Sequence, residues 1–368
     1  MRAYLYVMLV AAAVTYLMTP LVRRIARRVG AITPVRDRDV HKVPVPRMGG
    51  TAMLAGVAAA LVAASQMPFF AKVYTGGTPW GVLLGAAAVC LLGVLDDLWS
   101  LDAITKLAGQ ALAAGLMAWK GVQLVSLPLG GVTYPSFSVL LGLTVLVVVV
   151  TINAVNFVDG LDGLAAGIVG IAGSAFFIYS YLLAQKFSKD DYSSLASLIT
   201  AALVGCCLGF LPHNFNPARV FMGDSGSMLI GLLLASATVT ITGQVDPTAV
   251  SQAQIVPAFF PLLIPLAVLA LPLVDLLLAV VRRTRAGRSP WQPDKMHLHH
   301  RLLQLGHSHA RAVLILYIWT AIAAFGVAFM AFVPVRTALF AGAAAVVAAL
   351  LVTFGPLRGR RGLGRHAG

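Results

Sequence analysis

The chain contains very little charge and very few cysteines for its length. Only 11% of its 368 residues are charged, against 59% that are hydrophobic, and the mean hydropathy is +0.88. This balance excludes an ordinary soluble domain and indicates a polytopic helical membrane protein. The three cysteines, Cys90, Cys206 and Cys207, lack metal-ligand spacing. We expect them to pack as small apolar residues.

Long apolar stretches divide the chain into about eleven predicted spans, because a helix needs about 20 apolar residues to cross a bilayer. The predicted spans cover 3–22, 49–66, 79–95, 104–119, 137–156, 162–184, 194–211, 225–242, 255–281, 312–333 and 337–355. We therefore expect one all-α integral-membrane domain over residues 1–368. Its polar residues are concentrated in loops around 23–48, 96–105, 156–163, 212–225 and 282–311.

Lysine and arginine are distributed unequally between the two sides of the predicted bundle. Most of them fall in the polar loops named above and in the C-terminal tail. By the positive-inside rule, the N-terminus is then outside and the C-terminus cytoplasmic, which requires an odd number of spans. The net charge of +14 is explained by this topology and by attraction to anionic lipid headgroups. Because the basic residues are spread over several membrane loops, nucleic acid is not an expected partner.

Five aspartates lie at the edges of apolar spans, where charge is hard to accommodate. Such groups usually face the interior of a bundle and mark a functional site. Asp96 and Asp97 end the third span, and negative charge is unfavourable at a helix C-terminus. Asp159 and Asp162 share a face if the turn that carries them is helical. Asp224 precedes the eighth span, where its alternative role is an N-cap.

Other polar and aromatic side chains accompany these aspartates on the same side of the membrane. Lys106 begins the fourth span, and Asn156 interrupts the apolar run before Asp159. Phe221 precedes Asp224 by three residues and could stack on a base. Lys42, in the first basic loop, could hold phosphate oxygens, although a basic loop that only sets topology is the alternative.

The last cytoplasmic loop carries a histidine cluster formed by His297, His299 and His300, with Arg301 beside it. Two histidines at this spacing could bind zinc, but no cysteine or clean acidic third ligand accompanies them. Mg²⁺ prefers carboxylate and phosphate oxygens. We therefore interpret the cluster as contacts to a substrate phosphate or sugar, with a solvated surface helix as the alternative.

Together these loops offer carboxylates for Mg²⁺, cations for phosphates, an aromatic side chain for a base, and a bilayer for a lipid substrate. This combination predicts phosphoryl transfer from a nucleotide-activated donor to a membrane-held acceptor, chemistry that depends on positioning and charge neutralisation. An ion-coupled transporter or lipid flippase is the rival from another class. It predicts acidic residues near the bilayer midplane, whereas these lie at one interface.

The motifs resemble the polyprenyl-phosphate N-acetylhexosamine-1-phosphate transferases, over about residues 36–309. The matching runs are GVLDDLWSLDAITKLAGQ, TINAVNFVDGLDGLAAG, HNFNPARVFMGDSGS and SPWQPDKMHLHHRLL. The chain is more similar to the WecA/TagO-like branch than to the MraY-like branch of peptidoglycan synthesis. MraY-like enzymes have ten spans and three consecutive histidines in the last loop, where this chain has HLHH. An MraY-like phospho-N-acetylmuramoyl-pentapeptide transferase remains the alternative.

The resemblance implies transfer of N-acetylglucosamine-1-phosphate from UDP-N-acetylglucosamine to undecaprenyl or decaprenyl phosphate, with Mg²⁺ as cofactor and Mn²⁺ as a substitute. It implies Asp224 as the leading metal ligand and Asn156 as a second, with Asp96 or Asp97 contacting or deprotonating the acceptor phosphate. Further implied contacts are Asp159, Asp162 and Phe221 to uridine, Lys106 to the diphosphate, and His297, His299, His300 and Arg301 to the sugar-phosphate. The site then faces the cytoplasm in the cell membrane, and a homodimer is compatible with the family.

Overall fold

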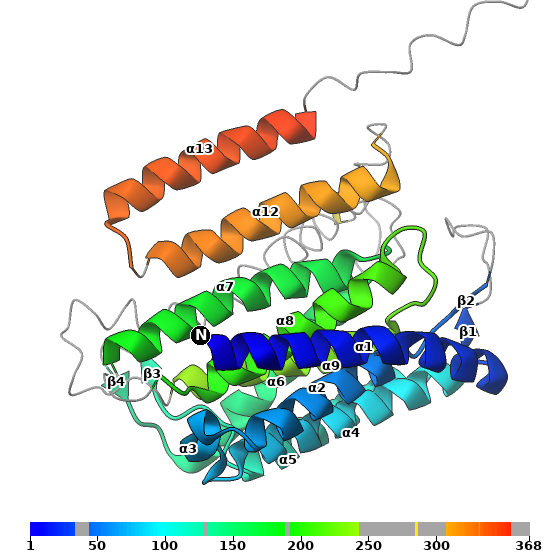
Figure 1. Cartoon of the computed structure of the whole chain (residues 1–368), viewed down its shortest axis with the longest axis horizontal. Coiled ribbons are helices and arrows are strands. Elements are labelled where there is room, and N and C mark those ends of the chain that lie inside the picture. The colour runs from blue at the N-terminus through cyan, green and yellow to red at the C-terminus, as the bar shows by residue number, and fades with distance from the viewer. Residues whose placement is uncertain are drawn as a thin grey trace, which may run out of the picture.

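The computed structural model describes residues 1–33, 44–128, 132–187, 192–242, 284–285, 307–330 and 332–354. Within these ranges, long helices run side by side in a bundle (Figure 1). The helices are α1 (Arg2–Val29), α2 (Gly49–Ser65), α3 (Ala71–Tyr74), α4 (Thr78–Trp99), α5 (Ala103–Trp119), α6 (Phe137–Val158), α7 (Leu164–Phe187), α8 (Leu195–Asn214), α9 (Gly223–Ile241), α12 (His309–Met330) and α13 (Val335–Phe354).

Two short strand pairs are the exception to the all-α expectation. Strand β1 (Ile32–Thr33) pairs antiparallel with β2 (Val45–Pro46), and β3 (Leu127–Pro128) pairs antiparallel with β4 (Val132–Thr133). Each strand has only two residues and lies in a loop between helices. The first pair returns the chain from the end of α1 to the start of α2.

The predicted polytopic membrane architecture is confirmed for the part of the chain that the structure describes. Eight helices there are long and apolar enough to cross a membrane. A ninth is added if α2 and the segment Pro68–Tyr74, which bend by 92° at their junction, form one broken span. The predicted span 255–281 lies outside the described residues. The total of eleven spans and the orientation of the termini therefore stay predictions.

Helix α9 occupies the centre of the bundle. It packs against α2, α4, α6, α7 and α8, and 89% of its most apolar stretch is buried. Glycines permit the closest approaches to its first turn. A Cβ added to Gly50 on α2 would meet the backbone of Ser225 and Gly226, and one added to Gly93 on α4 would meet the backbone of Asp224 and Ser225. The start of α9 is therefore held tightly between the start of α2 and the end of α4.

The three cysteines lie inside this packed interior, as the sequence predicts. Cys90 on α4 and Cys206 and Cys207 on α8 are all buried, and none forms a disulfide. Their role as small apolar packing residues is thus confirmed.

Candidate active site

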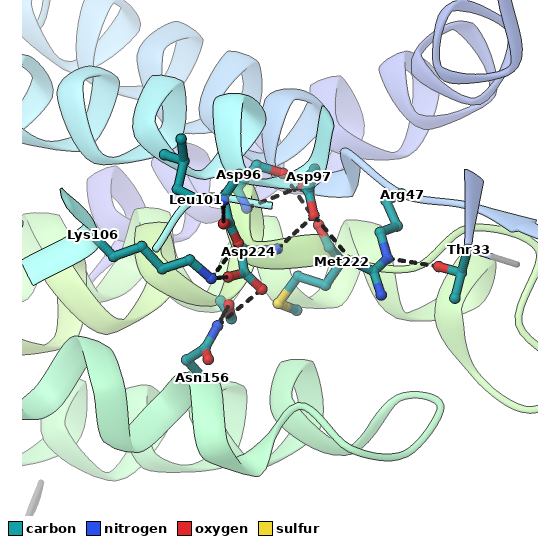
Figure 2. Close-up of polar contacts among 11 residues, drawn as sticks. Thr33, Arg47, Asp96, Asp97, Leu101, Lys106, Asn156, Met222 and Asp224 are labelled. Atoms are coloured by element: carbon teal, nitrogen blue, oxygen red, sulfur yellow. Dashed lines mark hydrogen bonds and ion pairs between the residues drawn. The ribbon is translucent and has the colours of Figure 1, made fainter. Parts of the chain in front are cut away.

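Polar residues that are far apart in the sequence meet at one end of the bundle (Figure 2). Asp96 and Asp97 come from the last turns of α4, and Asp224 comes from the first turn of α9. Lys106 lies on the first turn of α5, and Asn156 lies near the end of α6. Four helix ends thus build one cluster, as the sequence predicts from its acidic motifs.

Lys106 joins the two carboxylates that come from different helices. Its Nζ lies 2.5 Å from Asp96 Oδ2 and 3.0 Å from Asp224 Oδ2. The other oxygen of Asp96 accepts a hydrogen bond of 2.8 Å from the backbone N–H of Leu101. Asp96 and Asp224 therefore converge on a single cation. Burial strengthens this pairing, because solvent screens the charges less than at an exposed surface.

Asn156 holds the second oxygen of Asp224. Its Nδ2 donates to Asp224 Oδ1 over 3.2 Å and to Ser227 Oγ over 2.8 Å. Ser227 lies one turn beyond Asp224 on α9, so Asn156 contacts both residues from α6 at once. The structure thus shows Asn156 as a donor that orients Asp224. Metal ligation by Asn156 would require its carbonyl oxygen and stays a prediction.

Asp97 points away from Lys106 and into the start of α9. Its Oδ1 accepts from the backbone N–H of Asp224 at 3.0 Å, and its Oδ2 accepts from that of Ser225 at 3.3 Å. The side chain of Asp97 is 0% exposed. Arg47 Nη1 lies 4.0 Å from Asp97 Oδ1, and Arg47 Nε donates to Thr33 Oγ1 over 2.6 Å. Adjacent residues on a helix point about 100° apart, so Asp96 and Asp97 serve different partners.

Asp159 and Asp162 occupy the turn between α6 and α7 and differ in surroundings. Asp162 is buried, and its Oδ2 accepts from Asn216 Nδ2 and from the backbone N–H of Ala218, both at 3.0 Å. Asp159 is half-buried at the end of α6. Desolvation, reinforced by the charges of Asp224 and Asp97, raises the pKa of Asp159 to about 7.

The segment before α9 is tied to two other parts of the chain. Asn214 Oδ1 accepts from the N–H of Gly163, and Asn214 Nδ2 donates to the carbonyl of Val220, both at 3.0 Å. Phe221 donates its N–H to Pro46 over 2.8 Å, and its carbonyl accepts from Gly49 over 3.1 Å. Phe221 is half-buried in this position. The loop that carries the predicted base-stacking residue is thus fixed by backbone contacts on both sides.

Several predicted site residues lie outside the described residues. These are Lys42, His297, His299, His300 and Arg301. Their predicted contacts to phosphate and sugar therefore stay predictions.

Two residues in and beside the cluster were missed by the sequence reasoning. Ser227, the second partner of Asn156, looks like an ordinary small residue of an apolar span. Asp102 caps α5 four residues before Lys106, and its Oδ1 accepts from the N–H groups of Ile104 and Thr105 at 3.0 Å. These contacts, with that of the Thr105 hydroxyl foremost, lower the pKa of Asp102. An aspartate directly before a helical run is an N-cap signal that could have identified it.

The carboxylate oxygens of the cluster are the kind of ligand that a magnesium ion prefers. Among the described residues, no group of three or more His, Cys, Asp or Glu side chains could hold a metal. Mg²⁺ needs fewer protein ligands, because it keeps several waters and binds through one or two carboxylates together with substrate phosphates. Asp96 and Asp224 already place two carboxylates around one cation, the Lys106 ammonium. The donor set therefore fits Mg²⁺.

The fold and the site together define an integral-membrane protein with a carboxylate-rich centre at one end of its bundle. Residues 79–242 match glycosyl transferase family 4. The chain is 48% identical to a decaprenyl-phosphate N-acetylglucosaminephosphotransferase of Mycolicibacterium smegmatis, with 98% of this chain and 90% of the relative covered. The chain belongs to this family, the polyprenyl-phosphate N-acetylhexosamine-1-phosphate transferases, and the resemblance of its motifs is thereby confirmed.

More distant relatives represent both branches of the family. The chain is 32% identical to a probable undecaprenyl-phosphate N-acetylglucosaminyl 1-phosphate transferase of Bacillus subtilis, with 82% of this chain and 78% of the relative covered. It is also 32% identical to a phospho-N-acetylmuramoyl-pentapeptide-transferase of Desulforudis audaxviator, with 83% and 92% covered.

Proposed function

We propose that this protein transfers N-acetylglucosamine-1-phosphate from UDP-N-acetylglucosamine to a membrane polyprenyl phosphate. The products are UMP and polyprenyl-diphosphate-N-acetylglucosamine. The observation that carries this proposal is the convergence of Asp96, Asp224 and Lys106 at the end of an apolar bundle. A water-soluble nucleotide sugar and a lipid phosphate can meet there.

The names of the most similar relatives favour N-acetylglucosamine as the transferred sugar and a polyprenyl phosphate as the acceptor. The relative with 48% identity over nearly the full length is named for N-acetylglucosamine and decaprenyl phosphate, whereas the muramoyl-pentapeptide enzyme shares 32%. We therefore propose decaprenyl phosphate as acceptor, with undecaprenyl phosphate as the second choice. The active site then faces the cytoplasm, on the inner side of the cell membrane.

The chain's own residues position the two reactants. Asp224 and Asp96 would hold Mg²⁺, which supplies neutralisation of the diphosphate charge when bound. Lys106 would contact the diphosphate oxygens. An oxygen of the acceptor phosphate attacks the sugar-linked phosphorus of the donor, and the bond to the UMP oxygen breaks. The acceptor is already anionic near neutral pH, so positioning matters more than a protein nucleophile.

Asp159 and Phe221 lie on two loops near this centre and are proposed to hold the uridine. Phe221 supplies an aromatic face to the base, and base–aromatic stacking contributes about 1–3 kcal/mol. The pKa of Asp159, raised to about 7, leaves this carboxyl partly protonated near neutral pH. It can then either donate or accept a hydrogen bond to the uracil edge.

The decisive experiment measures UMP release by the purified protein with decaprenyl phosphate, Mg²⁺ and one UDP-sugar at a time. We expect turnover with UDP-N-acetylglucosamine and none with UDP-N-acetylmuramoyl-pentapeptide. The reverse preference would establish the muramoyl-pentapeptide reaction instead. No UMP from either donor, in protein that elutes as a single folded species, would contradict the transferase function altogether.

A further inference from the structure

The two aspartates at the end of α4 differ in what they contact. Asp96 contacts Lys106, the cation it shares with Asp224. Asp97 uses both of its carboxylate oxygens to accept backbone N–H groups from α9. The sequence places these aspartates next to each other and cannot distinguish them. The structure separates a carboxylate that faces the site from one that faces a helix end.

The first turn of α9 has no cap from its own sequence. The N-terminal N–H groups of a helix lack intrahelical partners, and an N-cap side chain usually accepts from the second or third residue. At α9 the N-cap residue is Met222, which makes no side-chain cap hydrogen bond. The second and third residues are Asp224 and Ser225. These are the two whose N–H groups Asp97 accepts.

The surrounding backbone is shaped to admit this carboxylate. Gly223 has a φ of +71°, a left-handed conformation that favours glycine. A Cβ at Gly223 would collide with the carboxylate of Asp97, and a Cβ at Gly93 would collide with the backbone of Asp224 and Ser225. Only glycine at these two positions allows α4 to approach the start of α9 this closely.

We propose that Asp97 is a positioning residue that caps α9 from the neighbouring helix α4 and thereby fixes the carboxylate of Asp224. It does not contact or deprotonate the acceptor phosphate. The inference rests on the proposed function, because it concerns which of the two adjacent aspartates reaches the reactants. The side chain of Asp97 is 0% exposed, and each of its oxygens already accepts a backbone N–H, so a substrate has no access to this carboxylate. Arg47 Nη1, at 4.0 Å from Asp97 Oδ1, partly balances its charge.

The test compares Asp97→Asn, Asp97→Ala and Asp96→Asn in the full-length purified protein. Asparagine keeps one oxygen that can accept an N–H, whereas alanine keeps none. We expect UMP release to fall about tenfold in Asp97→Asn and about a hundredfold in Asp97→Ala, since each lost bond involves a charged acceptor. The KM for UDP-N-acetylglucosamine should stay near that of the wild type, and the rate should keep its pH profile. Asp96→Asn should lose more activity than Asp97→Asn.

A second measurement does not depend on turnover. Hydrogen–deuterium exchange at the amides of residues 224 and 225 should become faster in both Asp97 variants and stay unchanged in Asp96→Asn, because only Asp97 bonds to these amides. Unchanged exchange there would contradict the capping role even if a variant were inactive.

The outcomes separate this inference from the proposed function. A wild-type protein that releases no UMP would contradict the proposed function. The capping role of Asp97 would then be tested by hydrogen–deuterium exchange alone. An active wild type, with Asp97→Asn as inactive as Asp224→Asn, a changed pH profile and normal amide exchange, would make Asp97 a catalytic residue and overturn the inference.

Discussion

Helices α9 and α13 are similar in length and both apolar, yet they lie in opposite surroundings. In α9, 89% of the most apolar stretch is buried, whereas in α13 the value is 11%. Helix α9 packs against five other helices, while α13 packs mainly on α12 at the edge of the bundle (Figure 1). Hydrophobicity therefore indicates that a segment can span the membrane, but it does not determine whether the helix lies at the centre or at the edge of the bundle.

The difference lies in the kinds of residue on each helix. Helix α9 begins with a cluster of Gly, Asp and Ser that contacts polar groups from α4 and α6. Helix α13 presents large apolar side chains to its surroundings, with Phe340 79% exposed. Lipid is as apolar as these side chains, so helix packing in a membrane depends on small and polar residues. The following predictions test whether function is confined to the centre around α9.

The largest effect is expected from Asp224→Asn. This change removes the charge that faces Lys106 and the proposed metal, so UMP release should fall by about a thousandfold. The matched control is Asp102→Asn, an exposed aspartate whose capping role asparagine can also perform. Both variants should elute as a single folded species in size-exclusion chromatography, as the wild type does. Near-normal turnover in Asp224→Asn would remove Asp224 from the metal site.

The next effect concerns packing at the start of α9. In Gly93→Ala the new methyl group would meet backbone atoms of Ser225, which cannot move as a flexible side chain can. Overpacking of this kind typically costs about 1–3 kcal/mol, so we expect a lower melting temperature and about tenfold less activity. Gly142→Ala on α6 is the control, because nothing lies within 4 Å of its added Cβ. Equal melting temperatures in the two variants would contradict the tight contact.

A smaller effect is expected from Ser227→Ala. The change removes one acceptor of Asn156 and leaves its bond to Asp224, so we expect about a three- to tenfold loss of activity, consistent with one neutral hydrogen bond. The control is Thr353→Val on α13, which removes the acceptor of Trp319 Nε1. Activity in that variant should not change. A comparable loss in both would show that α13 influences the site.

The smallest effect is expected from ending the chain after Pro334, which removes α13 and the tail. Lipid can replace α13 against the outer face of α12, so UMP release should stay within about twofold of the wild type. The assay is the same, with membrane insertion checked by fractionation. A large loss of turnover in correctly inserted protein would contradict the view that function depends on the central helices and not on α13.

Much of the fold could be predicted because hydropathy is read directly from residues. The predicted span 79–95 falls within α4, and 137–156 falls within α6. The ends of the helices were predicted less accurately. Helix α1 continues to Val29, seven residues past the end of the predicted span, and this extension contains four arginines. Long cationic side chains can reach water from a helix that leaves the apolar layer. The two short strand pairs were missed, because two-residue strands leave no periodic pattern.

The sequence predicts which residues form the candidate site better than it predicts what each of them contacts. The motifs predict a common site for Asp96, Asp97, Lys106, Asn156 and Asp224, and the structure brings these residues together. The partners were not predictable. Ser227 carries no signal in its local sequence, and Asp162 bonds to a segment more than fifty residues away.

The class of this protein, its approximate spans and the acidic motifs at the edges of those spans can all be predicted from the amino-acid sequence. These follow from local composition, because the energy of placing a charge or an apolar run in a membrane depends mainly on the segment itself. The central position of α9, the contact of Lys106 with both Asp96 and Asp224, and the hydrogen bonds from the start of α9 to Asp97 become visible in the folded chain. Those facts depend on the directions of side chains on different helices, which no single segment specifies.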